Sequence, residues 1–234
     1  MNKLLKKLRH FIMFNLKNKR VLITSGPTVE RIDPVRYISN FSSGKMGKAL
    51  SDAFSRAGAN VCVVTGPVSI KYDSAERVII IESAREMFEA CKNEFDSADI
   101  AICCAAVCDY RPKHKFDSKL KKEKDDKKLS CIELTKNPDI LKTLSKLKNE
   151  NQYVVGFCAE TNSVIDNAKS KLKSKSCDMI VANDVSEGKV FGKDDTSATI
   201  VTDSSTTDFK SGTKAELANL LVELISKEFN ERTF

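Results

Sequence analysis

Short runs of apolar, β-branched residues alternate along the chain with amphipathic stretches of helical length. This alternation predicts a doubly wound, mostly parallel α/β sheet. The predicted strands are 21–24, 60–65, 77–82, 100–105, 129–134, 153–158 and 179–182, followed by a final pair. Helices are predicted over 43–58, 84–95, 162–175 and 213–229, and another opens at Asn137-Pro138.

Polar segments follow several of the predicted strands directly. They are residues 25–40, 105–111, 159–162 and 183–184. Ligands of doubly wound sheets bind outside the carboxyl ends of the strands, where these segments converge. The pattern therefore predicts one composite site, although α/β proteins carry polar loops in any case.

The first strand leads into Gly26-Pro27 and then into a helix preceded by serines. We expect the hydroxyls of Ser42 and Ser43 to cap this helix, and Gly44 to let the backbone approach a ligand closely. A helix N-terminus attracts anions, but a plain capped helix explains these residues equally well. The long polar insert before the helix, which includes Arg36 and Asn40, favours a nucleotide site.

A chain of 234 residues that is 41% hydrophobic can bury one large core. We expect a single domain over 19–234, preceded by a basic amphipathic extension over 1–18. Packing of this extension on its own domain, a partner subunit or a neighbouring module is favoured over binding to a membrane surface. No run approaches the ~20 apolar residues of a membrane span, and no signal-peptide cleavage site is recognisable. The prediction is a cytoplasmic protein that does not bind membranes.

The cysteines and histidines do not form a metal or disulfide pattern. The eight cysteines mostly lie inside apolar runs, without a Cys-x-x-Cys pair, and the two histidines are His10 and His114. Zinc and a disulfide framework are therefore not expected, and the cysteines are interpreted as small hydrophobic residues in a reducing compartment.

The net charge of +7 is concentrated in residues 1–20 and 111–128. A nucleic-acid-binding protein would spread basic charge over a face interleaved with aromatic residues, and this chain has no Trp. Nucleic-acid binding is therefore not predicted. We expect residues 111–128 to form an exposed, flexible arm whose cations recognise phosphates locally.

Two common nucleotide motifs are absent. The turn after the first strand lacks the full Gly-x-Gly-x-x-Gly, and the second strand ends in Thr65-Gly66-Pro67, where an acidic residue would hold the ribose of NAD. Gly44-Lys45-Met46 also fails to match a phosphate loop of the Gly-Lys-Ser/Thr type.

A stronger indication is Ala105–Pro112 followed by Ser118–Lys122. Small residues at a strand end leave room for a ligand, and Asp109 can accept hydrogen bonds from a base or ribose or help to hold Mg²⁺. Lysines on a mobile arm can close over a triphosphate, although such a run is more often simply solvated. Lysines at the end of the 162–175 helix can likewise be explained by the helix dipole.

These motifs together resemble the phosphopantothenate-cysteine ligase family over about residues 19–230. The resemblance rests on Asp33–Gly47, Ala105–Pro112, Lys119–Lys122, Lys136–Ile140 with Val155–Asn162, and Ala182–Val185. It is closest to the bacterial form that is the second half of a bifunctional protein whose first half is a flavin-dependent decarboxylase. The fold implied is Rossmann-like or ribokinase-like.

The resemblance implies ligation of 4′-phosphopantothenate to L-cysteine in coenzyme A biosynthesis. The carboxylate attacks the α-phosphate of CTP, giving an acyl-cytidylate and pyrophosphate, and the cysteine amine then displaces CMP. The implied cofactor is Mg²⁺ on the triphosphate, and its protein ligands are not assigned. A homodimer with the basic arm near the site is implied, and association with a separate decarboxylase is conceivable.

The roles carried over by motif position fall into three groups. Lys119 serves the first step and Asn40 the second. The residues expected at the nucleotide are Ser43, Gly44, Asp109, Pro138, Asp139, Ile140, Leu141, Phe157, Lys171 and Lys175. Those expected at the substrate or acyl intermediate are Arg36, Asn40, Ala105 and Ala106.

Two departures from the family pattern matter. The decarboxylase half is missing from this sequence, and Cys108 stands where bacterial relatives often carry Ala. The alternative to an enzyme is a non-catalytic relative that binds a nucleotide or a partner protein. The presence of Asn40, Asp109 and Lys119 favours the enzyme.

Overall fold

The computed structural model describes residues 16–160, 162–184 and 194–232. The strands are β1 Arg20–Ser25, β2 Val29–Arg31, β3 Tyr37–Ser39, β4 Asn60–Thr65, β5 Arg77–Ile80, β6 Ile100–Cys103, β7 Tyr110–Pro112, β8 Leu134–Lys136, β9 Tyr153–Glu160, β10 Met179–Asp184, β11 Asp195–Thr202 and β12 Thr206–Thr213. The helices are α2 Lys45–Arg56, α3 Ala84–Phe95, α4 Lys122–Ser130, α5 Ile140–Leu147, α6 Val164–Lys175 and α7 Lys214–Arg232.

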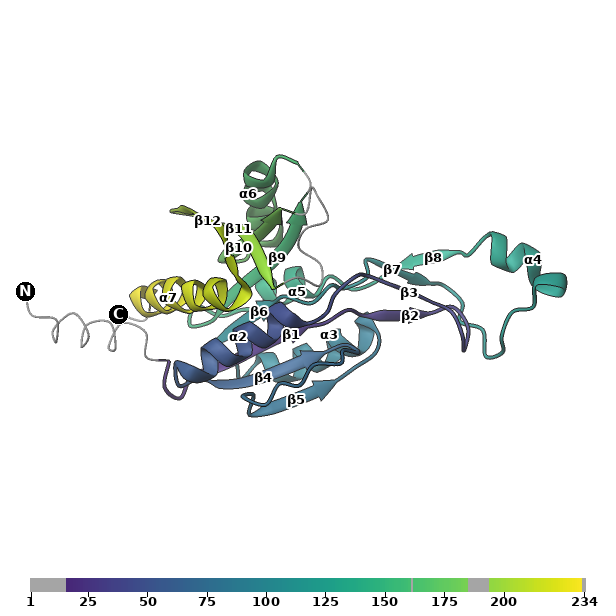
Figure 1. The fold of residues 1–234 in the computed structure, drawn as a ribbon, viewed down its shortest axis with the longest axis horizontal. Coiled ribbons are helices and arrows are strands. Elements are labelled where there is room, and N and C mark those ends of the chain that lie inside the picture. The colour runs from purple at the N-terminus through teal and green to yellow at the C-terminus, as the bar shows by residue number, and fades with distance from the viewer. Residues whose placement is uncertain (1–15, 161, 185–193, 233–234) are drawn as a thin grey trace, which may run out of the picture.

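An eight-stranded sheet forms the centre of the molecule, in the order β12-β11-β10-β9-β6-β1-β4-β5 (Figure 1). Strands β5, β4, β1, β6, β9 and β10 pair in parallel, whereas β11 and β12 form an antiparallel hairpin at one edge. The predicted doubly wound, mostly parallel sheet is therefore confirmed. Parallel strands are covered on both faces, which explains why β1 and β9 read as nearly continuous apolar runs.

Helices cover the two faces of the sheet in separate layers. Helices α2 and α7 pack on one face, where Leu50, Phe54 and Leu221 are fully buried. Helices α3, α5 and α6 pack on the other, through residues such as Met87 and Leu144. The chain runs from β1 outward to β4 and β5, and then returns to β6 on the other side of β1. The switch point of the topology therefore lies between β1 and β6.

A narrow arm projects from the body at the end of the molecule opposite to α7 (Figure 1). We call this arm the projecting arm. It consists of the antiparallel pairs β2–β3 and β7–β8 together with α4. Helix α4 buries none of its residues and is kinked at Asp125. Most of residues 111–128 are exposed, as predicted, but Pro112 and Leu120 are buried.

The prediction of a strand over 129–134 is wrong. Residues up to Ser130 belong to α4, and the strand β8 begins only at Leu134. Leu129 and Leu134 resemble the apolar positions of a strand, but this part of the chain lies outside the main sheet, and β8 pairs only with the three-residue β7. A run rich in Lys before Leu129 favours helix where the main sheet is not available.

The expected capping of α2 by Ser42 or Ser43 is also wrong. Helix α2 begins at Lys45, and its N-cap is Gly44 in a left-handed conformation (φ 75°), without a side-chain cap among the described residues. A side chain on Gly44 would be strained at this φ, and its Cβ would lie 2.9 Å from the Tyr72 hydroxyl. The tight turn therefore needs glycine more than it needs a serine cap.

The N-terminal extension lies mostly outside the described residues. Residues 1–15 are among those not described. Leu16 is fully buried and its backbone N–H donates to the Ala57 carbonyl at 3.0 Å, so the last part of the predicted extension packs on the domain. Within the described chain, no helix has the length and apolar character needed to span a membrane.

Gly47 offers a test of the packing between α2 and β1. A Cβ at this position would lie 2.0 Å from Ser25 Oγ and 2.4 Å from Ser25 Cβ, and Ser25 is buried. We expect Gly47→Ala to lower the free energy of unfolding by about 1–3 kcal/mol, measured by urea denaturation. Ser25→Gly in the same chain should recover part of this loss. Strictly additive effects in the double-mutant cycle would contradict the contact.

Candidate nucleotide and substrate site

Two neighbouring cavities open at the carboxyl ends of the central strands. The first, which we call the Asp109 pocket, has a volume of about 530 Å³. It extends over the ends of β6 and β9, the start of α5 and the last turns of α6. Its lining includes Asp109, Tyr110, Lys136, Asn137, Pro138, Asp139, Ile140, Leu141, Phe157, Lys171 and Lys175.

The second cavity, the Ser43 pocket, has a volume of about 180 Å³ and lies at the N-terminus of α2. Ala105, Phe157 and Cys158 line both cavities, so the two are compartments separated by a shared wall. The remaining lining of the Ser43 pocket includes Ser25, Gly26, Phe41, Ser42, Ser43, Gly44, Lys45, Gly47, Cys104, Ala106, Asn183 and Lys214.

The predicted nucleotide residues therefore divide between the two compartments. Asp109, residues 138–141, Phe157, Lys171 and Lys175 line the Asp109 pocket. Ser43 and Gly44 lie in the Ser43 pocket with Ala106, and Ala105 belongs to the shared wall. The predicted convergence of segments after β1, β6, β9 and β10 is confirmed, since all four contribute to the Ser43 pocket.

Backbone hydrogen bonds hold the segment after β6 against the segment after β1. The Ala106 N–H donates to the Gly26 carbonyl at 2.9 Å, and the Thr28 N–H donates to the Ala106 carbonyl at 3.2 Å. The Ala105 N–H donates to Thr24 Oγ1 at 3.1 Å. These bonds exist because β1 and β6 are neighbours, and they fix the shared wall.

Asn40 lies beside this segment. Its side-chain N–H₂ donates to the Val107 carbonyl at 3.1 Å, and Val107 lines the Asp109 pocket. Asn137 Nδ2 likewise donates to the Cys108 carbonyl at 2.9 Å. Both amides therefore hold the backbone between Ala106 and Asp109 through hydrogen bonds. Asn40 contacts this backbone from the start of the loop that leads to α2.

The two lysines of α6 are held by carboxylates at the rim of the Asp109 pocket. Lys171 Nζ lies 2.7 Å from Glu160 Oε1, and Lys175 forms an ion pair with Asp139. Burial alone would raise the pKa of Glu160, but the hydrogen bond and charge of Lys171 lower it. Asp139 also caps α5 by accepting from the Lys142 N–H at 3.0 Å. Both cations are thus oriented before any ligand binds.

The thiols at the site are poor nucleophiles. Cys158 lines both pockets, and burial raises its pKa to about 11; burial likewise raises the pKa of Cys104 to about 12. These groups remain protonated at neutral pH. Cys108 is also buried, and burial raises the pKa of its thiol.

Arg36 and Lys119 lie on the projecting arm and line neither pocket within the described part of the chain. Arg36 forms an ion pair with the buried carboxylate of Asp33, with Nη1 and Oδ2 2.6 Å apart. Lys119 is exposed and precedes the buried Leu120. Asn40 also lines neither pocket and reaches the site through its hydrogen bond to the Val107 carbonyl. The structure therefore gathers most of the predicted site in one place, but not Arg36 and Lys119.

Sequence reasoning missed part of the Ser43 pocket. Lys214 and Lys45, which forms an ion pair with Asp194, line this pocket and were not predicted to do so. Asn183, which belongs to the predicted segment 183–184, presents a buried Oδ1 that has no hydrogen-bond partner in the described chain. Lys214 is the first residue of α7, far away in sequence, and burial lowers its pKa. Asn183 lies near the end of β10, next to β9, where segment 183–184 was predicted to converge.

No group of three or more His, Cys, Asp or Glu side chains in the described residues is arranged to hold a metal ion. Mg²⁺ commonly takes one or two carboxylates together with substrate phosphates. Asp109, an exposed carboxylate in the Asp109 pocket, is the side chain suited to supply such a ligand.

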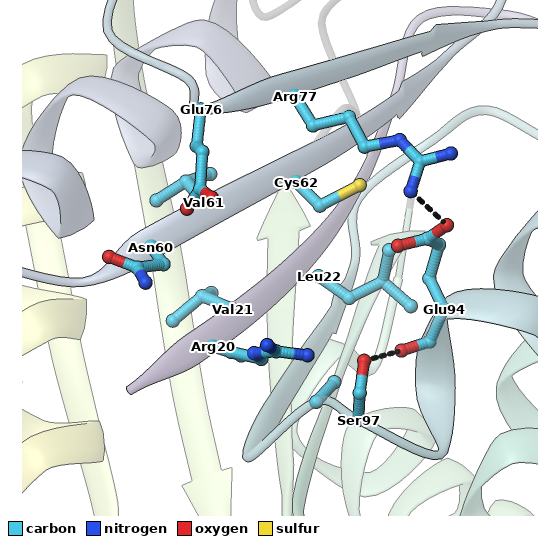
Figure 2. Close-up of a pocket in the computed structure, with 11 residues that line it drawn as sticks. Arg20, Val21, Leu22, Asn60, Val61, Cys62, Glu76, Arg77, Glu94 and Ser97 are labelled. Carbon is cyan, nitrogen blue, oxygen red and sulfur yellow. Dashed lines mark hydrogen bonds and ion pairs between the residues drawn. The ribbon is translucent and has the colours of Figure 1, made fainter. Parts of the chain in front are cut away.

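A further cavity lies at the opposite ends of the strands (Figure 2). It has a volume of about 210 Å³ and is lined by Arg20, Asn60, Cys62, Arg77 and Glu94, among others. Arg77 Nη1 lies 2.9 Å from Glu94 Oε1, so the charges in this cavity neutralise each other. It contains none of the predicted site residues.

Fold and site together define a doubly wound α/β protein with a two-compartment polar site at the switch point. The family model for the C-terminal domain of DNA/pantothenate metabolism flavoproteins matches residues 16–229. The chain belongs to this family, which confirms the resemblance drawn from the sequence motifs.

Relatives and solved structures agree with this assignment. The coenzyme A biosynthesis bifunctional protein CoaBC of Haemophilus influenzae is 43% identical over 93% of this chain, and the match covers 54% of that relative. The chain thus spans about half the length of the curated relatives it matches. The crystal structure of a CoaBC C-terminal domain is similar with a TM-score of 0.78 and 36% identity, covering 93% of this chain and 99% of that one. A Cab2 variant in complex with phosphopantothenate-cysteine shares the fold, with a TM-score of 0.71 at 15% identity over 99% of this chain and 94% of that one.

The buried Asp33 carboxylate offers a pH test of the projecting arm. Burial alone would raise its pKa, but hydrogen bonds from Val35, Arg36 and Leu120 outweigh this and lower it to about 2. In an unfolded chain the pKa of Asp is about 3.9, so the contribution of Asp33 to stability is present above that pH and is lost as the pH falls toward 2. We expect amide-exchange protection of Leu120 to decrease between pH about 4 and 2. In Asp33→Asn, which cannot titrate, protection should be low and constant over this range; the same pH dependence in the variant would contradict the prediction.

Proposed function

We propose that this chain is a phosphopantothenate-cysteine ligase of coenzyme A biosynthesis that activates its acid substrate with CTP. The observation that carries the proposal is the Asp109 pocket, which brings together eight of the residues that the resemblance assigns to the nucleotide. Membership of the family and the name of the CoaBC relatives support the pathway. Such a role would be carried out in the cytoplasm.

The proposed reaction has two steps. In the first, a carboxylate oxygen of 4′-phosphopantothenate attacks the α-phosphorus of CTP, and the bond to pyrophosphate breaks. In the second, the cysteine amine attacks the acyl carbon, CMP leaves with its bonding electrons, and the amine loses a proton. Negative charge shifts onto the leaving phosphates in the first step and onto the acyl oxygen in the second, so each step needs its own electrostatic stabilisation.

The two compartments suit this division. Lys171 and Lys175 supply fixed positive charge for the triphosphate in the Asp109 pocket, and Mg²⁺ held by the triphosphate with Asp109 would neutralise further charge there. Phosphate oxygens would replace Glu160 and Asp139 as the partners of the lysines. In this proposal the reacting end of the acid substrate would bind at the shared wall near Ala105, between the nucleotide and α2 and next to the chain held by Asn40.

Lys119 requires a second copy of the chain in this proposal. It lies on the projecting arm and lines neither pocket of its own chain within the described residues. The arm exposes the apolar side chains of Val35, Tyr37, Tyr110 and Leu134, at 46–57% of their full accessible area. An exposed apolar surface of this kind is typical of an interface. We therefore propose a homodimer in which the arm of one subunit brings Lys119 to the site of the other.

The central experiment supplies phosphopantothenate, cysteine and either CTP or ATP, and measures pyrophosphate and nucleoside monophosphate. CTP-dependent release of both products is expected. No turnover with either nucleotide would contradict the ligase and favour a non-catalytic, nucleotide-binding relative. Turnover with ATP alone would retain the ligase but overturn the assignment of CTP.

Two substitutions test the division of labour between the steps. Lys119→Gln should suppress pyrophosphate release, because it removes the cation assigned to activation. Asn40→Asp should still release pyrophosphate but stall before amide formation, so that acyl-cytidylate accumulates and can be detected by mass spectrometry. Equal losses at both steps in both variants would refute the assignment.

The lysines of α6 provide a matched comparison. Lys171 and Lys175 line the Asp109 pocket, whereas Lys173 is exposed on the same helix and does not. A charge-assisted hydrogen bond contributes about 1.5–3 kcal/mol, which corresponds to roughly 10- to 150-fold in affinity. Lys171→Met and Lys175→Met should therefore raise the KM for CTP by at least about tenfold, and Lys173→Met should leave it within twofold. Similar effects of all three substitutions would indicate a general charge effect instead.

A further inference from the structure

The segment that carries Lys119 is tied to the β2–β3 turn on both sides of the lysine. On one side, the Phe116 N–H donates to the Ile32 carbonyl at 2.9 Å. On the other, the Leu120 N–H donates to Asp33 Oδ2 at 3.2 Å. Arg36 Nη1 also approaches the Leu120 carbonyl at 3.3 Å. Lys119 thus lies between two anchored residues on a projecting arm.

The Asp33 carboxylate is the centre of this arrangement. It is fully buried, although it lies on an arm that is otherwise widely exposed. Its Oδ1 accepts from the N–H groups of Val35 and Arg36, both at 2.8 Å, and its Oδ2 accepts from the Arg36 guanidinium and from Leu120. A buried carboxylate needs several donors to offset the loss of hydration, and Asp33 has four.

The hydrogen bonds of Asp33 shape the β2–β3 turn and hold it close to the segment that carries Lys119. The Asp33 side chain closes the turn onto its own backbone, and the Ile32 N–H donates to the Arg36 carbonyl at 2.9 Å. Leu120, 87 positions further along the chain, is 4% exposed and packs into this turn. Asp33 therefore joins two segments that the chain order does not bring together.

We propose that Asp33 is a positioning residue for the activation step: its carboxylate clamps the Leu120 backbone to the β2–β3 turn, so that Lys119 projects from the arm at a fixed place. This inference rests on the proposed function, in which Lys119 acts on the triphosphate. A lysine on an unanchored loop would lose conformational entropy each time it engaged the phosphates, whereas an anchored lysine has already lost much of it.

The clamp depends on charge and on the acceptor at Oδ2. Asn at position 33 can still accept from Val35 and Arg36 through its oxygen, but its amide N–H₂ would then face the Leu120 N–H and the Arg36 guanidinium, both of which are donors. Asp33→Asn should therefore preserve the turn while releasing Leu120. Asp117 lies on the same segment, is exposed and has no hydrogen bond or ion pair to any described residue, so Asp117→Asn is a control with the same change of charge.

The test combines hydrogen exchange with separate assays of the two half-reactions. In Asp33→Asn, amide exchange over residues 116–121 should rise at least tenfold, while exchange in the central sheet stays unchanged. Pyrophosphate release should fall at least tenfold, mostly in kcat. Formation of product from preformed 4′-phosphopantothenoyl-cytidylate and cysteine should stay within threefold. Asp117→Asn should behave as the wild type in all three measurements.

Each contrary result has a distinct meaning. Unchanged exchange over 116–121 would show that the carboxylate does not clamp Leu120. The exchange measurement does not depend on catalysis, so it can be read even if the wild-type protein releases no pyrophosphate. A wild-type protein that releases no pyrophosphate would refute the proposed function instead. Raised exchange with normal pyrophosphate release, or equal losses in both half-reactions, would overturn the positioning role. If Asp33→Asn does not fold, Asp33→Glu keeps the charge but displaces the carboxylate by one methylene, and it should show the same selective loss of the first step.

Discussion

The parallel pairing of β1 with β6 is the constraint on which the site depends. It brings two loops that are some eighty residues apart in sequence to the same edge of the sheet, where the backbone of Ala106 bonds to Gly26 and Thr28. Because successive strands leave β1 in opposite directions, a gap opens above this pair that no crossover helix fills. The Ser43 and Asp109 pockets occupy that gap, and their shared wall consists of residues that the pairing positions.

The charged side chains at this edge of the sheet are already held in ion pairs before a ligand binds. The lysines of α6 are paired with Glu160 and Asp139, and the N-terminus of α2 opens without a side-chain cap in the described chain. A site that must accept several phosphates gains from cations whose positions are already restricted, because less conformational entropy is lost on binding. The carboxylates hold the cations in place, and in the proposed function a triphosphate would displace the carboxylates because it carries more charge.

The projecting arm is stabilised mainly by hydrogen bonds and not by an apolar core. It has too little apolar material for a core of its own, and α4 buries no residue at all. Its order comes from short antiparallel pairs and from the buried carboxylate of Asp33, which accepts hydrogen bonds from four donors. A structure held mainly by directional bonds can place one side chain accurately far from the body of the protein. This property would suit an arm that serves a neighbouring subunit.

The sequence by itself determined the class of fold, because buried parallel strands require apolar runs and amphipathic helices require a periodic face, and both patterns can be recognised locally. It also determined the family, through motifs whose residues mostly converge at one edge of the sheet. Local pattern failed where structure depends on distant partners. The turn at Gly44 follows from its packing against Tyr72, and the strand expected over 129–134 begins only at Leu134, because this segment lies outside the main sheet and residues up to Ser130 are helical. Only the tertiary structure decided that Lys214 joins the Ser43 pocket, that Asp33 meets Leu120, and that Lys119 lies away from both pockets, since each depends on how far-separated segments pack.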